Sequence, residues 1–396
     1  MPMNVDVAII GAGPAGLCLA RALAESGLRI VVLERQAEAA LSAPAFDGRE
    51  IALTHYSAQL MRELGLWERI DSQAISPLRD ARVFNGSSLF SLNIDHRDTQ
   101  QRELGYLVSN HLIRKAAYDA AKSSPAITLK TGAQVAGIHS GADGAQVTLT
   151  NGEVIQTQLL VGADSRFSET RRAMGIAADM HDFGKTMMVC VMEHPIAHQH
   201  TAWEWFDYGQ TLALLPMNGM RSSVVITLPP KAIDSLMGMQ QEEFDRVISA
   251  RFQHRLGAMR LISTRHAYPL VTVYANRLVG QRFALVGDAA VGMHPVTAHG
   301  FNFGLRGIAT LSGEIKAAQA SGRDIAANSL LLRYERAHRR HTRPLFLATH
   351  AIAKLYGSDS PPARLLRAGA LRMGNRITPF RRAVAGFLAD APQLLP

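Results

Sequence analysis

The sequence predicts an α/β protein with two interleaved parts and a helical C-terminal region. At residues 5–10 a short run of apolar, mostly β-branched residues leads into a glycine-rich turn, as expected for a strand buried on both faces of a parallel sheet. Two further apolar runs, residues 159–164 and 282–288, end in glycine and aspartate. Residues 186–229 are rich in strand patterns, and the chain after Phe303 has helical periodicity. We therefore expect a parallel sheet, a separate second sheet and C-terminal helices.

The first glycine-rich turn has the spacing G-x-G-x-x-G. Gly11 allows the tight turn, Gly13 lets a pyrophosphate approach the backbone, and Gly16 lets the next helix pack closely on the strand. That helix is expected over residues 14–26, with Ala15 in its first turn. Its free amides and positive dipole end favour binding of the pyrophosphate. The unit predicts a Rossmann-like dinucleotide site.

The second predicted strand ends in an acidic residue. Glu34 closes the apolar run 28–33, roughly 20 residues beyond the glycines, where a carboxylate accepts hydrogen bonds from ribose hydroxyls. Arg35 follows it. This order of strand, glycines, helix, strand and acid favours a nucleotide site over a glycine-rich turn that binds nothing. NAD and FAD both use such a unit, so the choice of dinucleotide stays open at this point.

Composition is that of a globular enzyme. The 396 residues are 47% hydrophobic and 19% charged, enough for two domains with a sizeable core. The net charge of +9 is compatible with nucleic acid, anionic lipid or an acidic substrate. No nucleic-acid motif accompanies that charge, so we expect no nucleic-acid partner. No stretch reaches the roughly 18 apolar residues that span a bilayer.

Neither the cysteines nor the histidines predict a metal site. Cys18 and Cys190 have no metal-ligand spacing and no disulfide framework around them, which favours a reducing, cytoplasmic location. His194, His198 and His200 lie in a polar loop without a supporting acid or cysteine. We therefore predict no metal ion.

A late glycine-containing segment favours FAD. Gly287 and Asp288 end the third apolar run, where a carboxylate can accept hydrogen bonds from a ribityl chain. A helix that starts near Gly300, with Phe301 and Asn302 in its first turn, directs its N-terminal amides at a neighbouring group. If that neighbour is a flavin ring, the helix end stabilises negative charge on the reduced ring. NAD needs no such third segment.

With these motifs the sequence resembles the class A flavoprotein aromatic hydroxylases and, among them, the ubiquinone-biosynthesis hydroxylases. The three fingerprints of that group are the glycine triplet, a G-A-D-G-like middle motif and a late G-D-A motif. Here the middle motif is Gly162-Ala163-Asp164-Ser165, and the late motif occupies residues 287–306. Further matches to the ubiquinone branch are residues 47–49, 51–53, 104–106, 201–204, 212–216 and 334–335.

Four positions depart from the pattern of that group. Ser165 replaces a glycine of the middle motif, and Val291 replaces a histidine of the late motif. His299 stands where glutamine is common, and Gly307 follows the late motif where aspartate is usual. These departures affect the assignment of subfamily and ring position, whereas the cofactor assignment does not depend on them.

The resemblance implies the fold of para-hydroxybenzoate hydroxylase. In that fold an α/β, Rossmann-like FAD-binding domain is interleaved with a β-sheet substrate domain, and helices follow at the C-terminus. A hairpin turn at Asn85-Gly86 is expected to open the substrate domain. The predicted boundaries are 1–75, 104–180 and 277–325 for the FAD-binding domain, 76–103 for the substrate-domain hairpin, 181–276 for the substrate sheet and 326–396 for the C-terminal helical region.

The resemblance and the motifs together predict the site residues. The expected cofactor-binding residues are Gly11, Gly13, Ala15, Gly16, Glu34, Arg35, Arg49, Asn110, Asp164, Gly287, Asp288, Pro295, Gly300, Phe301 and Asn302. Arg49 could instead be an ordinary surface charge. His294, Pro295 and His299 are the expected catalytic residues: either histidine could bond the flavin or a substrate hydroxyl, or be satisfied by nearby backbone, and the proline shapes the turn that meets the ring.

The resemblance also implies the reaction. NAD(P)H, as a transient reductant, reduces FAD, O2 adds to form a hydroperoxide, and its distal oxygen attacks an electron-rich phenol. The expected substrate is a lipophilic, polyprenylated phenol or quinol held in an apolar pocket beneath the sheet. Two alternatives remain: a hydroxylase of a small soluble aromatic compound, and a flavin-holding accessory subunit without turnover.

The expected location is the cytoplasm. Peripheral contact with the inner face of the cytoplasmic membrane is an option, because arginines and apolar residues alternate in the C-terminal helices. Those arginines could equally just solvate the helices. The sequence leaves open whether the chain works in a biosynthetic complex or as a homodimer.

Overall fold

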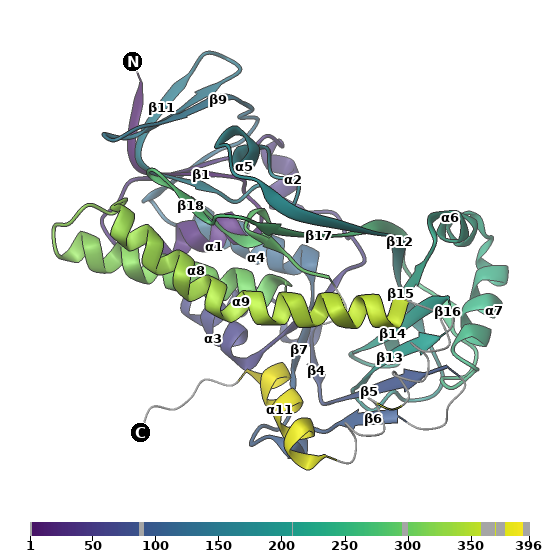
Figure 1. Ribbon diagram of the computed structural model, residues 1–396. Helices are drawn as coiled ribbons and strands as arrows, with labels where there is room; N and C mark the ends of the chain where they lie inside the picture. The colour runs from purple at the N-terminus through teal and green to yellow at the C-terminus, as the bar shows by residue number, and fades with distance from the viewer. Residues whose placement is uncertain are drawn as a thin grey trace.

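The structure is a computed structural model that describes residues 2–86, 91–207, 209–294, 300–357, 369 and 377–390. It contains an eight-stranded, a nine-stranded and a three-stranded sheet. Helices pack against the first two sheets, and α8 and α9 run side by side (Figure 1). The α/β fold class predicted from the sequence is confirmed.

The eight-stranded sheet is parallel at its centre. The strands follow the path β18-β19-β11-β1-β2-β8. Neighbouring strands from β19 to β8 pair in parallel, in four pairs. Antiparallel β9 and β10 extend β11 to one side. The strands are β1 (Met3–Ile10), β2 (Ile30–Leu33), β8 (Ile127–Lys130), β9 (Val135–Ser140), β10 (Ala145–Leu149), β11 (Val154–Gly162), β18 (Val279–Gly280) and β19 (Phe283–Leu285).

Helices bury both faces of this sheet. Val7, Ala8 and Ile9 of β1 have no exposed surface, which explains why the strand is apolar at every position rather than at alternate ones. The surrounding helices are α1 (Pro14–Leu23), α2 (Glu38–Ser42), α3 (His55–Glu63), α4 (Asn110–Lys122), α5 (Glu169–Ala173), α8 (Gly300–Ala320) and α9 (Asn328–Gly357). Short 3₁₀ turns are η1 (Trp67–Arg69), η2 (Ser72–Ala74), η3 (His96–Asp98) and η4 (Gly287–Ala289).

The nine-stranded sheet has the order β20-β17-β12-β15-β14-β13-β5-β6, with β16 beside β12. Its strands are β5 (Asp80–Asn85), β6 (Ser91–Ile94), β12 (Ala178–Glu193), β13 (Thr201–Asp207), β14 (Gln210–Met217), β15 (Arg221–Leu228), β16 (Arg260–Leu261), β17 (His266–Ala275) and β20 (Val291–Gly292). The small third sheet comprises β3 (Glu50–Leu53), β4 (Ile75–Leu78) and β7 (Gly105–Ser109).

The two faces of the nine-stranded sheet pack differently. On what we call the outer face, Met188 and Cys190 of β12 join a core with Phe244 from α7 (Gln241–Arg251) and Ile233 from α6 (Pro230–Gly238). These two helices lie to one side of the sheet in Figure 1. Val189, between the two β12 residues, belongs to a separate small cluster on the opposite, inner face. This alternation is the period-two pattern of a strand with two distinct faces.

The hairpin predicted at Asn85-Gly86 is present. β5 and β6 pair antiparallel, with Phe84 opposite Ser91, and Gly86 follows β5 in a turn with φ of +55°. Residues 87–90 lie outside the described residues. Turn dipeptides mark a hairpin, but strand pairing determines its register.

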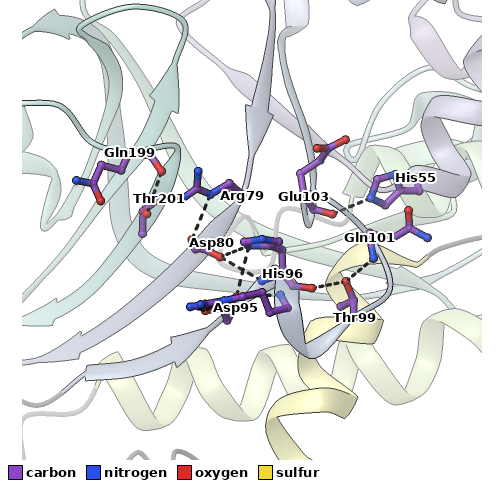
Figure 2. Close-up of polar contacts among 11 residues, drawn as sticks. His55, Arg79, Asp80, Asp95, His96, Thr99, Gln101, Glu103, Gln199 and Thr201 are labelled. Carbon is purple, nitrogen blue, oxygen red and sulfur yellow. Dashed lines mark hydrogen bonds and ion pairs between the residues drawn. The ribbon is translucent and has the colours of Figure 1, made fainter.

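A polar cluster holds the hairpin in place. Figure 2 shows Asp80 of β5 beside His96, and the His96 backbone amide and ring Nδ1 both lie within hydrogen-bond distance of Asp80 Oδ1, at 3.1 and 2.8 Å. Asp95 pairs with Arg97 at 2.6 Å, which holds the pKa of that carboxyl at about 2. Because these carboxylates already have cationic or N–H partners, we assign the cluster a structural role.

The C-terminal helix α11 (Thr378–Ala389) packs on this hairpin, as Figure 1 shows in yellow. Ala385 lies in an apolar cluster with Leu92 and Ile94 of β6. Just beyond the helix, Asp390 accepts hydrogen bonds from Arg306 of α8 at 2.8 and 2.6 Å. Thus α11 links the second sheet to α8. Within the described ranges, no helix has both the length and the apolar composition needed to cross a bilayer.

Candidate active site

The glycine loop after β1 has the geometry that its spacing predicts. Gly11 has φ of +108°, and a Cβ there would lie 2.5 Å from the carbonyl oxygen of Ala163. A Cβ on Gly16 would collide with the carbonyl oxygen of Gly11. By contrast, a Cβ on Gly13 would have no neighbour within 4 Å. The loop is therefore closed on its protein side and open where a phosphate would approach.

The start of α1 offers donors to such a ligand. Gly13 is the N-cap, and no side chain caps the helix, so its first amides remain available for an anion. Beside the loop, the amides of Ala12 and Gln36 donate to Glu34 at 2.8 and 2.9 Å. These bonds hold the Glu34 carboxylate at the end of β2, whereas Arg35 is exposed.

The middle motif supports the loop mainly from within the protein. Asp164 accepts hydrogen bonds from the Ser168 hydroxyl at 2.5 Å and the Thr170 amide at 3.1 Å. Its Cα would lie 2.8 Å from a Cβ on Gly11. Arg171, only 2% exposed, donates to the carbonyl oxygen of Ala289 at 3.0 Å. The middle motif thereby braces both the first glycine loop and the late motif.

The late motif meets the first glycine loop directly. A Cβ on Gly287, where φ is +60°, would lie 2.6 Å from Cβ of Ala15. In the first turns of α8, a Cβ on Gly304 would lie 3.7 Å from the Cα of Gly287. Asp288, next to this contact, pairs with Arg166 at 2.9 Å and keeps 41% of its side chain exposed. The start of α8 at Gly300 is thus about one helical turn from the site of contact.

Asn302 attaches the start of α8 to the third sheet. Its side-chain amide donates to the carbonyl oxygen of Ala52 at 2.8 Å and accepts from the Thr54 amide at 3.1 Å. Phe301 is partly buried against the main core. The N-terminus of α8 is therefore fixed relative to β3, and Gly300 has open space at its Cβ position.

Arg49 lies just before β3. It pairs with Asp47 at 2.6 Å, and the Asn110 side chain donates to the same Asp47 oxygen at 2.7 Å. Burial opposes ionisation of Asp47, yet the bonds from Arg49 and Asn110 bring its pKa below the usual value. Next along the chain, burial raises the pKa of Glu50 to about 7 although the Ser109 hydroxyl donates to it.

The Arg49 loop contacts the inner face of the nine-stranded sheet. The hydroxyl of Tyr268 on β17 donates to the Asp47 carbonyl oxygen at 2.7 Å, and the Arg49 guanidinium lies 5.2 Å from the centre of the Tyr268 ring. A Cβ on Gly48 would lie 2.7 Å from Cγ2 of Val189. The Arg49 loop therefore lies against the inner face of the second sheet.

His294 is described, whereas Pro295 and His299 lie outside the described residues. The His294 ring lies edge-on to Phe183 at 4.8 Å. Burial, and then the nearby His350 and Arg166, lower the pKa of His294 to about 4. The imidazole is therefore neutral at physiological pH, and a neutral ring can donate one hydrogen bond and accept another.

Packing explains one departure from the family pattern, Gly307, but not another, Ser165. A Cβ on Gly307 would lie 2.7 Å from Cε1 of His338 in α9, so this position has no room for the usual aspartate. The His338 ring is 2% exposed and stacks on Tyr334. Nothing in the described contacts explains Ser165.

Sequence reasoning missed several residues of this region, among them Asp47, Glu50, Arg166, Phe183 and Tyr268. The sequence placed Arg166 beside the middle motif, which was a usable indication. No local pattern indicates Phe183 or Tyr268, because they reach the site only through strand pairing in the second sheet. Among the polar loop histidines, His194 lies within hydrogen-bond distance of Ser222 Oγ at 2.8 Å and of the Ile196 carbonyl oxygen at 2.9 Å.

A parallel sheet with a phosphate-binding loop, a second glycine motif beside it, and a second sheet over both define a dinucleotide-dependent enzyme of the flavin hydroxylase class. The FAD binding domain family model matches residues 4–347. Ubiquinone hydroxylase UbiM of Neisseria meningitidis is 44% identical over 388 residues, which cover 97% of this chain and 84% of that protein. Ubiquinone hydroxylase UbiL of Rhodospirillum rubrum is 37% identical, over 98% of this chain and 91% of that protein.

A solved structure, p-nitrophenol 4-monooxygenase PnpA from Pseudomonas putida, shares the fold with a TM-score of 0.79 and 17% identity over 100% of both chains. The chain belongs to the FAD binding domain family and, within it, to the ubiquinone hydroxylases. Its cofactor is FAD, and the open Gly13 position together with the uncapped N-terminus of α1 fits a dinucleotide pyrophosphate.

Proposed function

We propose that this enzyme hydroxylates the aromatic ring of a polyprenylated phenol or quinol on the route to ubiquinone, using O2 and NAD(P)H. The observation that carries this proposal is the contact of Gly287 with Ala15, which brings the late motif to the first glycine loop. The names of the two relatives support the same reaction class. When bound, FAD supplies the redox chemistry that activates oxygen.

The residues of the chain bind and orient the cofactor in this proposal. The amides near Gly13 and Ala15 bind the pyrophosphate, and Glu34 accepts hydrogen bonds from ribose hydroxyls. Asp288 does the same for the ribityl chain. Arg35 and Asp164 contribute less, because Arg35 is exposed and both Asp164 oxygens already accept hydrogen bonds from the protein.

In this proposal the N-terminus of α8 faces the flavin ring. Gly300, Phe301 and Asn302 direct amides and a positive dipole end toward it, while Arg49 and Asn110 adjoin it from the β3 side. His294 precedes α8 and borders the place where the substrate ring reacts, whereas Pro295 and His299, the other two proposed catalytic residues, lie outside the described residues. The substrate must be held close and water kept out, which the apolar inner face favours.

The test is hydroxylation by the isolated chain. Purified protein should be yellow or take up FAD, and a phenol with a short prenyl tail should stimulate NAD(P)H oxidation and yield a product one oxygen atom heavier by mass spectrometry. Equal stimulation by an untailed phenol would favour the small-aromatic alternative. A yellow protein that yields no hydroxylated product would instead favour the accessory subunit.

We infer that the outward face of α11 contacts an anionic bilayer. Ile377 and Arg382 are exposed there, whereas Ala385 faces the protein. Arg364, Arg367, Arg372 and Arg376 lie outside the described residues. An exposed arginine near an exposed apolar side chain fits an anionic lipid surface. Contact there would give the enzyme access to a polyprenyl substrate.

Liposome sedimentation tests the bilayer contact. The double variant Ile377→Ser/Arg382→Glu should lose binding to anionic vesicles and keep its activity on a short-tailed substrate. Ile196→Ser removes an exposed apolar side chain that is distant from α11 in the sequence. This variant is the control and should bind anionic vesicles as wild type does. Unchanged sedimentation of the double variant would refute the role of α11. Light scattering on the same preparations distinguishes a monomer from a homodimer.

A further inference from the structure

Glu204 occupies the inner face of β13, opposite two tryptophans. Trp205 is 2% exposed and, with Trp203, packs in the outer-face core beneath α6 and α7. Because neighbouring residues of a strand point to opposite faces, Glu204 points to the inner face. The alternation Trp203-Glu204-Trp205 separates the glutamate from both tryptophans, and the packing of the tryptophans beneath α6 and α7 shows which face each occupies.

Strand pairing aligns Glu204 with the region of the cofactor loops. Glu204 pairs with Ala213 of β14, Ala213 with Val225 of β15, and Val225 with Val189 of β12. Directly paired residues share a face, so the four side chains form one row. At the end of this row Val189 meets Gly48, beside Arg49. Glu204 stands three strand spacings away, roughly 14 Å.

The middle of this row borders open space. On β14 and β15 the outer-face residues Leu212, Leu214, Val224 and Ile226 are fully buried, at 0% exposure. The inner-face residues between them, Ala213, Leu215, Val225 and Thr227, all keep intermediate exposure. The alternation shows that helices cover one face of these strands, whereas much of the other face, with the exception of the buried Ser223, keeps some accessible surface. The small side chain of Ala213 leaves room directly beside Glu204.

Within the described residues, no group donates a hydrogen bond to the Glu204 carboxyl and no cation pairs with it. Glu204 keeps intermediate exposure, yet burial raises its pKa to about 8. Glu204 is thus a partly accessible carboxyl with no partner among the described residues. Placing it in an otherwise apolar wall is costly unless a polar group of a ligand meets it.

We propose that Glu204 recognises the free hydroxyl group of the substrate's aromatic ring, and this proposal rests on the hydroxylase function proposed above. A neutral carboxyl can both donate to and accept from a phenolic hydroxyl. Ala213 and Val225 provide the apolar floor on which the ring lies between Glu204 and the loop at Gly48. The ring end of the substrate, rather than its prenyl tail, therefore lies beside Glu204, because an apolar tail would leave the carboxyl without a hydrogen-bond partner.

The experiment measures binding of matched ring analogues to the FAD-loaded enzyme by the change they cause in flavin absorbance. One analogue carries a free phenolic hydroxyl, and the other is its methyl ether. Wild type should prefer the phenol by ~10-fold or more, the value of a hydrogen bond made by a buried, otherwise unpaired group. In Glu204→Leu the preference should fall to within about twofold, and Glu204→Gln, which can still donate and accept, should retain most of it.

Glu193→Gln is the matched control, because Glu193 lies in the same sheet and is partly buried like Glu204, but it is paired with Arg260. It should behave as wild type, and all three variants should load FAD equally. A phenol preference that persists in Glu204→Leu, or a wild type that binds both analogues alike, overturns the assignment. If the analogue binding follows expectation but wild type gives no hydroxylated product, the proposed reaction fails while the recognition by Glu204 stands.

Discussion

Gly287 lies against Ala15, so close that a Cβ on the glycine would come within 2.6 Å of the alanine Cβ. These residues are distant in sequence and belong to the two glycine motifs. Their contact brings the end of β19 to the first turn of α1, and it carries α8 to the same place. The cofactor site depends on this approach.

Gly287→Ala should therefore lower FAD affinity and melting temperature. The added methyl group meets Ala15, and a φ of +60° is strained for alanine by roughly 1 kcal/mol. Flavin fluorescence titration and thermal melting measure the two effects. Gly219→Ala has a similar φ of +74° but no neighbour within 4 Å, so it isolates the backbone strain. Equal FAD affinity in the two variants would show that the Gly287 contact is unimportant for binding.

Replacing Glu34 should weaken FAD binding more than it weakens folding. Glu34→Ala removes an acceptor for two backbone amides and the proposed ribose contact, and hydrogen bonds to charged groups contribute about 1.5–3 kcal/mol each. FAD affinity should fall by about tenfold or more. Glu25 lies just after α1 and has an exposed side chain. Glu25→Ala is the control and should leave the FAD affinity unchanged. If Glu34→Ala lowered the stability of the FAD-free protein by as much free energy as it lowered FAD binding, the role of Glu34 would be purely structural.

Restoring the aspartate usual in this family should destabilise this protein. Gly307→Asp places a side chain where His338 already lies, because a Cβ on residue 307 would stand only 2.7 Å from Cε1 of that ring, and overpacking costs about 1–3 kcal/mol. His338→Ala should also destabilise, by leaving a cavity. The double variant Gly307→Ala/His338→Ala should lose less than the sum of the two corresponding single changes in denaturant unfolding. Strict additivity would show that the two sites are not coupled.

Stability should depend on pH through Glu204. Its folded pKa of about 8 lies above the usual value of 4.5, so the folded state binds the proton more tightly than the unfolded one. This contribution is fully present below pH 4.5 and is lost as pH rises to about 8. The melting temperature of Glu204→Gln relative to wild type should therefore increase between about pH 5 and pH 8. A flat difference for Glu204→Gln would contradict the burial of this carboxyl.

Local sequence was sufficient for the parts of the site that one segment forms by itself. The spacing of Gly11, Gly13 and Gly16 determines the loop geometry, because the Gly16 position meets the Gly11 carbonyl oxygen within the same turn and the Gly13 position meets open space. The late segment with Gly287 and Asp288 favoured FAD over NAD, and the family resemblance added to that argument. The hairpin at Asn85-Gly86 was also a successful local prediction, because β5 and β6 pair antiparallel on either side of this turn dipeptide.

The sequence by itself determined the α/β class, the phosphate-binding loop and the order of the motifs, since these depend on periodicity and on contacts between close neighbours in the chain. Only the tertiary structure decided which face of β13 Glu204 occupies, how Tyr268 and Val189 meet the Arg49 loop, and why position 307 has no side chain. Those relationships arise between strands and helices far apart in sequence. Strand register and helix packing set them, and neither leaves a local pattern in the residues involved.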